Sequence, residues 1–489
     1  MRTYLYKLAS EEFEGRETAA FGQKMAAAYI AKHFSDAGIK PYKDSTYYQQ
    51  YPLVRKHIEG CRIASNKKEF TLFKDYYYFP GLEDTLINSS DIVFFGYGIN
   101  EKKYSDFKKD IDIRGKVIVI LNDEPVNKKG ISYITRSKEY SAWTNSWKEK
   151  INYLKEYDPT AILIVIDSLE AQVKIYEHHI KAPTIKLDAQ KTKSSKAVPH
   201  IYISKDMANT ILSTTQRNID ELEKKIRKKG KSNSFEFKSN VTIDIKRPEE
   251  KTSAENVLGY LEGTDLKDQL IIISAHYDHL GKHGNEIYYG ADDDASGTSA
   301  VMELAKAFSI AEKEGHGPRR SILFMAFSGE EKGLMGSEYY AENPVFPLDS
   351  TVANLNIDMI GRIDEKYAGN PDYVYIIGSD RLSTQLHKIN ENANATYTKL
   401  ELDYTYNKPD DPNRFYYRSD HYNFAKKNVP VIFYFNGMHA DYHKLTDTTD
   451  KINFDAMDKR ARLVFFTAWQ LANQEERIKE DVQNDLKEK

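Results

Sequence analysis

The segment from Leu270 to Gly297, which reads LIIISAHYDHLGKHGNEIYYGADDDASG, constrains the fold of this chain more than any other. Its first residues, Leu270 to Ala275, are almost all apolar, which predicts a short buried strand of a parallel sheet that stops at His276. Side chains at the carboxyl end of such a strand face the crevice in which open α/β sheets bind ligands. Asp278 could accept the proton of the second ring nitrogen of His276, which would orient this imidazole as a metal ligand.

Three consecutive aspartates, Asp292 to Asp294, lie in the same segment and precede a helical pattern. Their carboxylates repel one another, and a nearby cation makes such an arrangement favourable. Taken alone, an aspartate-rich loop before a helix is usually an N-cap in solvent, and a single His-x-Asp sequence is usually an ordinary polar loop. The groups that follow other strands favour a metal site over these two interpretations.

Three further predicted strand ends carry acidic or imidazole groups. The strand SILFMAFS precedes Glu330 and Glu331, adjacent carboxylates that point in different directions, so that one can bind a metal while the other stands free. Asp358 lies in an apolar run, where a carboxylate needs a counter-charge. His443 follows the strand VIFYF. Two zinc ions about 3.5 Å apart, with one shared carboxylate and Glu330 left over as a base, suit the whole set: His276, Asp293, Glu331, Asp358 and His443.

Length and composition exclude several classes of protein. A chain of 489 residues predicts two or more domains. Its 70 basic and 73 acidic residues give a net charge of -3, which argues against nucleic acid or an anionic membrane as the main partner. The single cysteine, Cys61, excludes an internal disulfide framework and any cysteine-based zinc site.

The sequence contains no membrane span, because no apolar run approaches about 18 residues. The N-terminus also lacks the basic and then apolar layout of a signal peptide. We expect a secreted or periplasmic protein whose export signal is absent from this sequence, and a cytoplasmic location stays open. The sequence does not indicate the oligomeric state.

Sequence patterns divide the chain into four regions. Residues 1–63 form the N-terminal part of a catalytic domain, 64–241 an inserted β-rich domain, 242–475 the catalytic domain, and 476–489 a charged tail that we expect to be solvated or frayed. Strands alternate with helices from residue 256 onward, which predicts an α/β fold with a mixed, mostly parallel sheet and helices on both faces. The expected strands are 256–261, 270–275, 321–328, 351–357, 373–377 and 430–435, and the expected helices are 295–312, 380–395, 420–427 and 455–473.

At these positions the chain resembles the co-catalytic zinc metallopeptidases, a family that includes bacterial leucyl-type aminopeptidases and glutamate carboxypeptidases. The resemblance rests on AHYDHLG, GADDDASG, FSGEEKGLMGSEYY, NIDMIGR and DYHKLTDTTDKI, which together are highly specific. It spans about residues 254–473, extends to the helical pattern near the N-terminus, and implies the zinc aminopeptidase-like fold. The insert resembles a protease-associated domain, although FFGYGI and GKVIVIL are much less specific motifs.

The resemblance implies how the metal ligands are shared. The position of His276 binds one zinc together with Asp358, and Glu331 binds the other together with His443. Asp293 bridges the two ions. The resemblance therefore implies two zinc ions per chain.

The resemblance also implies three catalytic positions. Glu330 matches the general base, which takes a proton from water and returns it to the leaving amine. Asp278 orients the first zinc-binding histidine. Tyr442 matches a position whose phenol donates to the oxyanion, and the alternative is a tyrosine that only packs under His443.

These features predict an enzyme that hydrolyses peptides. A site rich in carboxylates favours a free α-ammonium group, so we expect an aminopeptidase. A carboxypeptidase or dipeptidase would need cationic anchors; Arg414 and Arg418 could serve, although arginines in a tyrosine-rich loop more often stack or pair structurally. His421, next to Asp420, could support the site, contact substrate or be structural.

Two other classes of protein remain as alternatives. A glutaminyl cyclase shares the fold but works with one zinc, and the complete set of five ligands speaks against it. A catalytically inactive receptor-like relative is the other alternative. The retained Glu330 speaks against that one, but the sequence alone does not establish turnover, residue specificity or peptide length.

Overall fold

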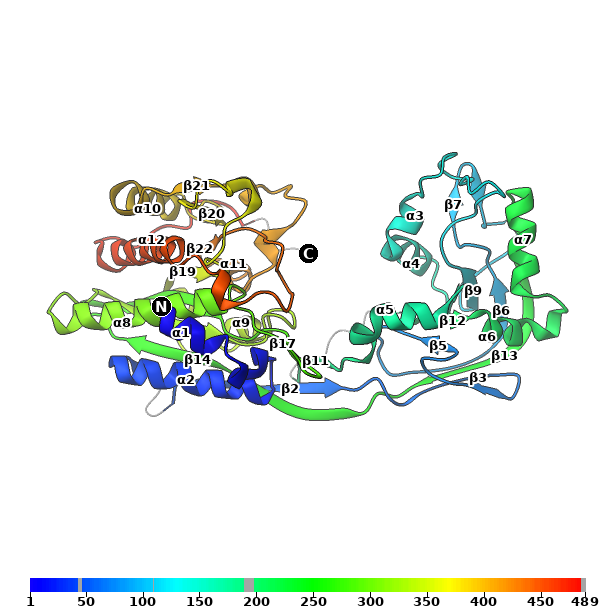
Figure 1. Ribbon diagram of the computed structural model, residues 1–489, viewed down its shortest axis with the longest axis horizontal. Coiled ribbons are helices and arrows are strands. Elements are labelled where there is room, and N and C mark those ends of the chain that lie inside the picture. Colours follow the sequence, from blue (N-terminus) through cyan, green and yellow to red (C-terminus); the bar gives the residue numbers. More distant parts are fainter. Residues whose placement is uncertain (43–45, 109, 189–197, 485–489) are drawn as a thin grey trace. The chain divides into compact units, whose positions relative to one another are not determined.

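The computed structural model describes residues 1–42, 46–108, 110–188 and 198–484, and they form two units (Figure 1). Unit 1 comprises Met1–Leu53, Lys186–Ala189 and Lys251–Lys489, and unit 2 comprises Val54–Ile185 and Gln190–Glu250. The predicted insert, 64–241, lies inside unit 2. This unit extends further at both ends because its boundaries fall within two long strands, β2 (Tyr48–Lys56) and β14 (Glu249–Leu261).

Unit 1 is built on a sheet with the strand order β11-β2-β14-β18-β15-β19-β22-β20-β21, and β1 pairs with β14. The four neighbouring strands β18, β15, β19 and β22 run parallel, whereas β14 and β20 run antiparallel to their neighbours β18 and β22. The sheet is therefore mixed and mostly parallel at its centre, as predicted. The other strands are β1 (Lys40–Pro41), β11 (Thr184–Leu187), β15 (Leu266–His276), β18 (Arg320–Phe327), β19 (Thr351–Ile357), β20 (Tyr373–Ile377), β21 (Glu401–Asp403) and β22 (Val431–Phe435), and a separate hairpin joins β16 (Gly281–His283) to β17 (Glu286–Tyr288).

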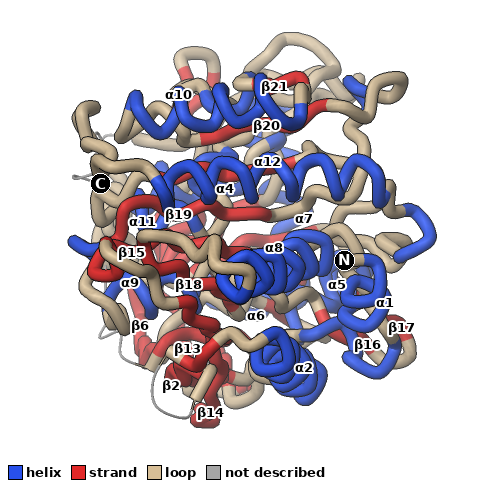
Figure 2. Tube along the Cα trace, turned by 90° about the vertical axis from the view of Figure 1, so that its left-hand side faces the viewer, coloured by secondary structure: helices blue, strands red, loops and turns tan. Residues whose placement is uncertain are grey.

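Helices cover both faces of this sheet because side chains alternate along the buried strands. Ile271 and Ile273 pack in one core, and Leu270 and Ile272 pack in the other. The first core includes α1 (Arg2–Leu8), α2 (Phe21–Ala37), α8 (Ala295–Lys313), α10 (Thr384–Ala393) and α12 (Phe454–Asn473), and the second includes α9 (Met335–Glu342) and α11 (His421–Ala425). Figure 2 shows α10, α12, α8 and α2 in this order within one layer. No helix among the described residues is both long and apolar enough to cross a membrane.

Unit 2 contains a second sheet, with the strand order β4-β3-β13-β6-β9-β10-β12-β5. Strands β6, β9, β10 and β12 run parallel, and the edge strand β5 runs antiparallel to β12. The strands are β3 (Cys61–Ser65), β4 (Lys68–Phe70), β5 (Tyr76–Tyr77), β6 (Thr85–Phe94), β9 (Val117–Leu121), β10 (Ala161–Ile166), β12 (His200–Ser204) and β13 (Phe235–Ile245), and β7 (Asn100–Glu101) pairs separately with β8 (Tyr104–Ser105).

The description of the insert as β-rich is incomplete, because helices follow several of the parallel strands. They are α3 (Ala142–Asn145), α4 (Trp147–Lys155), α5 (Leu169–Lys181), α6 (Lys205–Leu212) and α7 (Ile219–Lys229). Parallel strands need crossover connections, and helices are the usual ones. Unit 2 is thus a mixed α/β unit as well.

The C-terminal tail, which we expected to be solvated or frayed, is exposed over most of its described residues but is anchored to unit 1 at several points. Ile478 is buried in the core of unit 1, and the Arg477 guanidinium donates to the carbonyl oxygens of Asp349 and Thr351. Asp481 accepts hydrogen bonds from Thr384. The sequence did not predict these contacts, because the tail is almost wholly polar. One buried isoleucine and a few specific hydrogen bonds are enough to hold such an extended segment. Residues 485–489 lie outside the described residues.

Candidate metal centre

The candidate site of unit 1 lies where the parallel strands end. His276 is the last residue of β15, Glu330 and Glu331 follow β18, and Asp358 follows β19. His443 lies in the loop after β22. Since the carboxyl ends of parallel strands meet at one edge of a sheet, residues more than 160 positions apart in the sequence come together there.

The carboxylate of Asp293 lies between two imidazoles. Its Oδ1 is 3.2 Å from Nε2 of His276, and its Oδ2 is 3.1 Å from Nε2 of His443. Asp293 is buried, and it reaches this position from the loop before α8. The predicted bridging residue therefore faces both predicted halves of the site.

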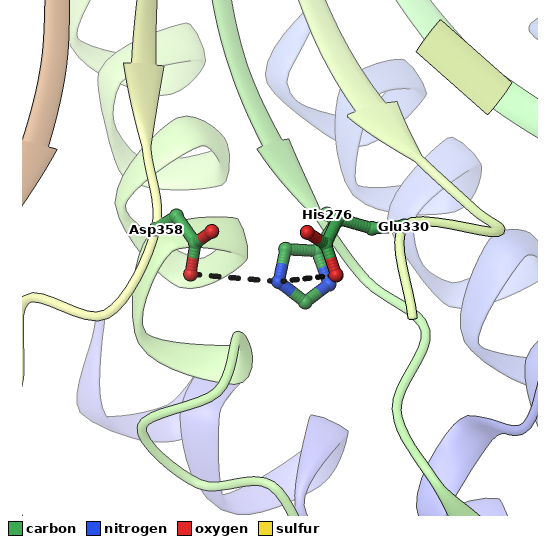
Figure 3. Close-up of side chains that lie close together, drawn as sticks. All are labelled: His276, Glu330 and Asp358. Atoms are coloured by element: carbon green, nitrogen blue, oxygen red, sulfur yellow. Dashed lines mark ion pairs between the residues drawn. The ribbon is translucent and has the colours of Figure 1, made fainter. Parts of the chain in front are cut away.

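One group of possible ligands consists of His276, Glu330 and Asp358 (Figure 3). Nε2 of His276 is 3.5 Å from Oδ1 of Asp358 and 3.8 Å from Oε2 of Glu330. Figure 3 shows the two carboxylates directed at the imidazole from different strand ends. One ligand atom from each residue lies within 4.8 Å of the others. Glu330, predicted as a base, thus stands close enough to be a ligand as well.

A second group consists of His279, Asp293 and Glu331. Nδ1 of His279 is 2.8 Å from Oε1 of Glu331, and Nε2 of His443 is 3.3 Å from Oε2 of the same carboxylate. His279 is an addition to the predicted site. Its signal was present in the sequence, since it lies in the same AHYDHLG motif as His276, but it lies beyond the strand end on which the prediction relied.

Several buried polar atoms at this site have no hydrogen-bond partner among the described residues. They are Nε2 of His276, both ring nitrogens of His279 and Oε1 of Glu331. The ion-pair contacts of His276 with Asp293 at 3.2 Å and of His279 with Glu331 at 2.8 Å lack hydrogen-bond alignment. A buried polar atom without a hydrogen-bond partner costs free energy, so these atoms fit a role as metal ligands. Imidazole and carboxylate donors together suit a divalent transition metal.

The electrostatics of the site also favour a cation. Burial lowers the pKa of His443, but the carboxylates of Asp293 and Glu331 outweigh burial and raise this pKa to about 10. Burial and Asp293 raise the pKa of Glu331, but His279 and His443 outweigh them and lower it to about 2. Without a metal, imidazolium groups therefore compensate the carboxylates, and a bound cation can take over this role.

Asp278 contacts both His276 and the backbone of Glu330. Its backbone oxygen is 3.2 Å from Nδ1 of His276, whereas its carboxylate oxygen Oδ1 is 3.7 Å from the same nitrogen. The carboxylate instead accepts hydrogen bonds from the Thr18 hydroxyl and from the backbone N–H of Glu330. Asp278 therefore connects the N-terminal segment to the segment that carries Glu330.

A layer of hydrogen bonds behind Asp293 fixes its loop. The Asp447 carboxylate accepts from the backbone N–H groups of Asp292 and Asp293. Asp294 accepts from Gly297 N–H at the start of α8 and from Met359 N–H. Of the three aspartates, Asp293 therefore faces the site, and Asp294 is the N-cap of the helix.

A small cavity of about 30 Å³ adjoins the site. Asp293, Glu330 and Asp358 form its polar side, and Met359, Phe415, Phe433, Phe435 and Met438 form its apolar side. Tyr442 and Arg418 also line it, and the Arg418 guanidinium donates to the Tyr442 hydroxyl at 3.4 Å. The Tyr442 ring also stacks on His443, with centroids 3.8 Å apart.

Three other candidates of the tyrosine-rich loop, residues 413–424, do not belong to the lining of this cavity. The Arg414 guanidinium lies over the Tyr417 ring, 4.8 Å from its centroid. His421 is buried against Phe433, and burial lowers its pKa to about 3. Asp420 is buried too, and burial raises its pKa to about 7. Of these four candidates, Arg418 alone lines the cavity, and the packing of His421 fits a structural role.

Comparison with known proteins identifies the part of the chain that carries this site. Residues 256–468 match the model of peptidase family M28. This segment carries the similarity to the M28 family. The predicted resemblance to co-catalytic metallopeptidases is thereby confirmed.

Relatives of this chain include metalloproteases and carboxypeptidases. A probable zinc metalloprotease of Pyrenophora teres f. teres is 28% identical over 244 residues, which cover 44% of this chain and 48% of that protein. A probable glutamate carboxypeptidase of Arabidopsis thaliana is 38% identical over 105 residues, which cover 21% of this chain and 14% of that protein. The chain thus spans less than half the length of these two relatives.

Solved structures confirm the fold over nearly the whole chain. An aminopeptidase from Aneurinibacillus sp. strain AM-1 has a TM-score of 0.54 at 18% identity and covers 99% of this chain and 97% of its own. A zinc aminopeptidase from Bacillus subtilis has a TM-score of 0.52 at 17% identity, with 99% and 98% covered. The expected zinc aminopeptidase-like fold is therefore confirmed.

Proposed function

We propose that this chain is a zinc-dependent exopeptidase, an aminopeptidase that removes N-terminal residues from peptides. The observation that carries the proposal is the position of Asp293 between His276 and His443, with the Glu330 carboxylate beside them. A bridging carboxylate, flanking imidazoles and a neighbouring acid are the components of two-metal hydrolysis. The M28 match and the names of the relatives support the same reaction.

Two zinc ions fit the donors of this site. His276 and Asp358 would hold one, Glu331 and His443 the other, and Asp293 would contact both, with His279 as a further donor or support for the second. Zinc, when bound, acidifies water and polarises a carbonyl oxygen. The buried atoms that lack hydrogen-bond partners at His276, His279 and Glu331 support this assignment.

Glu330 is the general base in this proposal. Its carboxylate lines the cavity beside Asp293 and Asp358, and Asp278 holds its backbone N–H. Burial raises the pKa of Glu330, which makes its carboxylate a better proton acceptor than an exposed one. Glu330 accepts the proton of the attacking water and then delivers it to the leaving amine.

Tyr442 is the donor to the developing oxyanion. Its hydroxyl lines the same cavity as Glu330, and the hydrogen bond from Arg418 orients it. A phenol in this position donates to an oxygen that becomes negative in the transition state. The alternative, a tyrosine that only packs on His443, retains support from the stacked rings.

The charge of the cavity favours the amino end of the peptide. Its three carboxylates attract an α-ammonium group, while its apolar side can contact the first side chain. Arg418 lines the cavity as well and supports the second candidate, a carboxypeptidase or dipeptidase that binds a substrate carboxylate. A panel of substrates separates the two.

The experiment compares L-aminoacyl p-nitroanilides with N-acetylated dipeptides, and zinc per chain is measured on the same samples. An aminopeptidase releases nitroaniline and leaves the acetylated dipeptides intact, whereas a carboxypeptidase does the reverse. One zinc with cyclisation of N-terminal glutamine indicates a glutaminyl cyclase, and no turnover of any substrate indicates a receptor-like protein. Glu314→Gln, at an exposed position at the end of α8, is the matched control for variants of the acidic site.

Two further assignments belong to this proposal. The motifs FFGYGI and GKVIVIL support unit 2 as a protease-associated domain. A place outside the cytoplasm is the second assignment. Fractionation of cells that express the natural gene tests the second assignment, and recovery in the cytoplasm alone would contradict it.

A further inference from the structure

Unit 2 contains a cavity of about 590 Å³ that the proposed peptidase reaction does not use. Its floor is the sheet face formed by Tyr77 on β5, Tyr202 on β12 and Ile164 on β10. Lys150 on α4 and Gln172 on α5 line it from the helices. A cavity of this volume is typical of sites for small molecules.

The cavity lies beside the carboxyl ends of parallel strands. Asn122 and Asp123, which follow β9, belong to its lining. This edge is where open α/β sheets bind ligands. The location therefore agrees with the volume in indicating a binding site.

Lys150 is a buried cation that forms no ion pair with a described carboxylate. The residue is only 5% exposed, and its ammonium donates to the backbone oxygen of Asp123. Among the described residues, no carboxylate forms an ion pair with it. The nearby carboxylates have other partners. Asp123, which acts on Lys150 only at longer range, accepts from the Asn122 amide. Glu124 accepts from Ser132, Ser141 and Thr144, and Asp106 accepts from Tyr104 and two backbone N–H groups. Because a buried charge is costly unless it is paired, the position of Lys150 favours a bound anion.

The aromatic residues of the cavity floor place hydrogen-bond donors near the Lys150 ammonium. Tyr77 and Tyr202 lie opposite each other on adjacent strands, and their rings stack 4.8 Å apart at 6°. Both are buried, and neither hydroxyl forms a hydrogen bond with a described residue. The Gln172 amide also forms no side-chain hydrogen bond within the described part of the chain. Phenols and an amide beside an ammonium suit a carboxylate, and the aromatic rings suit an apolar substituent on it.

We propose that this cavity binds an α-carboxylate that carries an apolar side chain, with the carboxylate on the Lys150 ammonium and the side chain against Tyr77 and Tyr202. The source is either the C-terminal residue of a peptide or a free amino acid. The site belongs to unit 2 alone, and its assignment does not rest on the proposed peptidase function.

Isothermal titration calorimetry on the full chain at pH 7 tests this assignment with three probes. N-acetyl-L-phenylalanine has the carboxylate without the ammonium, its amide has neither charge, and L-phenylalanine has both. The acetylated acid is expected to bind at least tenfold more tightly than its amide. Equal affinity of acid and amide, or no binding of any probe up to 10 mM, overturns the proposal.

Variants locate the site. Lys150→Gln is expected to weaken binding of N-acetyl-L-phenylalanine at least tenfold, while Lys155→Gln on the same helix α4 leaves it unchanged. Tyr77→Phe keeps the ring and the fold and is expected to weaken binding about threefold, which covers the case in which the lysine variant unfolds. Unchanged affinity in both Lys150→Gln and Tyr77→Phe contradicts the assignment.

A further variant separates this cavity from the acidic site of unit 1. Glu331→Gln alters unit 1 only, so the affinity for the acetylated acid should stay the same, and loss of binding would place the ligand in unit 1.

The comparison of the acetylated acid with free L-phenylalanine identifies the source of the natural ligand. Equal binding of the acetylated and free acids indicates peptide C-termini, and tighter binding of L-phenylalanine indicates a site for free amino acids near Asp123.

Discussion

At the carboxyl ends of its parallel strands, unit 1 collects buried carboxylates around Asp293, whereas unit 2 places a single buried ammonium, Lys150, beside phenols and an amide. Both edges are formed by the same kind of sheet, so the backbone does not determine what is bound there. The difference lies in which charge remains uncompensated. An excess of carboxylates favours a cation, and a cation without a counter-ion favours an anion.

The largest expected effect is that of replacing Glu330, the proposed general base, which lies among the proposed metal ligands of unit 1. Glu330→Gln should lower kcat for an aminoacyl p-nitroanilide about 10² to 10⁴-fold, because the amide cannot accept a proton. Zinc per chain should stay at two in this variant. Loss of one zinc would instead make Glu330 a ligand of the group that it forms with His276 and Asp358.

Replacement of Tyr442 tests whether the carboxylate-rich site of unit 1 also stabilises an oxyanion. Tyr442→Phe should lower kcat about 10²-fold with little change in KM, because only the hydroxyl is removed. Tyr397→Phe, an exposed tyrosine stacked on Phe466, is the matched control. A Tyr442→Phe enzyme with normal kcat would restrict this residue to packing on His443.

His279 shows how far the cation site extends beyond the predicted ligands. His279→Ala should weaken zinc binding about 10 to 100-fold, whether this imidazole binds the metal or supports Glu331. Competition with a chromogenic chelator measures the affinity without any need for turnover. His316→Ala, at an exposed position, serves as the control. Equal affinity in the His279 and His316 variants would remove His279 from the site.

The smallest expected effect is a pH dependence of ligand binding at Lys150, the buried ammonium of unit 2. Burial lowers the pKa of Lys150 to about 8, while Asp123, Asp106 and Glu124 oppose this shift. The ligand carboxylate stays ionised throughout, so affinity for N-acetyl-L-phenylalanine should be constant below pH 8 and fall up to about tenfold per pH unit above it. Burial raises the pKa of Asp106 only to about 6, outside this window. Calorimetry between pH 7 and 10 measures the dependence, and Lys150→Arg should remove it because arginine stays charged.

Local patterns in the sequence predicted the elements of unit 1 well. The strand that ends at His276 and the helix from Ala295 are present because apolar periodicity reports burial directly. In unit 2, α5 and α6 escaped prediction for different reasons. The helix α6 has only eight residues, and α5 exposes Ile175 and Tyr176, so that its apolar residues do not mark a single buried face. The burial of Ile478 was not predicted, because a single apolar residue in a charged tail shows no apolar periodicity.

Placement of His279 depends on contacts that no local pattern contains. Its backbone N–H donates to the backbone oxygen of Arg16, and Glu17 forms a bridge with it. The Arg16 guanidinium, fully buried, donates to the carbonyl oxygens of Leu8, Tyr277, Tyr289 and Gly290. The N-terminal segment therefore shapes the loop between β15 and the aspartates, from more than 250 residues away.

Zinc bound per chain, measured by mass spectrometry after dialysis against metal-free buffer, tests most directly whether the excess of buried carboxylates in unit 1 holds cations. We expect two zinc ions in the parent chain and fewer than one in Asp293→Ala, because both ions share that carboxylate. A parent chain that retains only traces of zinc, or an Asp293→Ala chain that retains two, would contradict it.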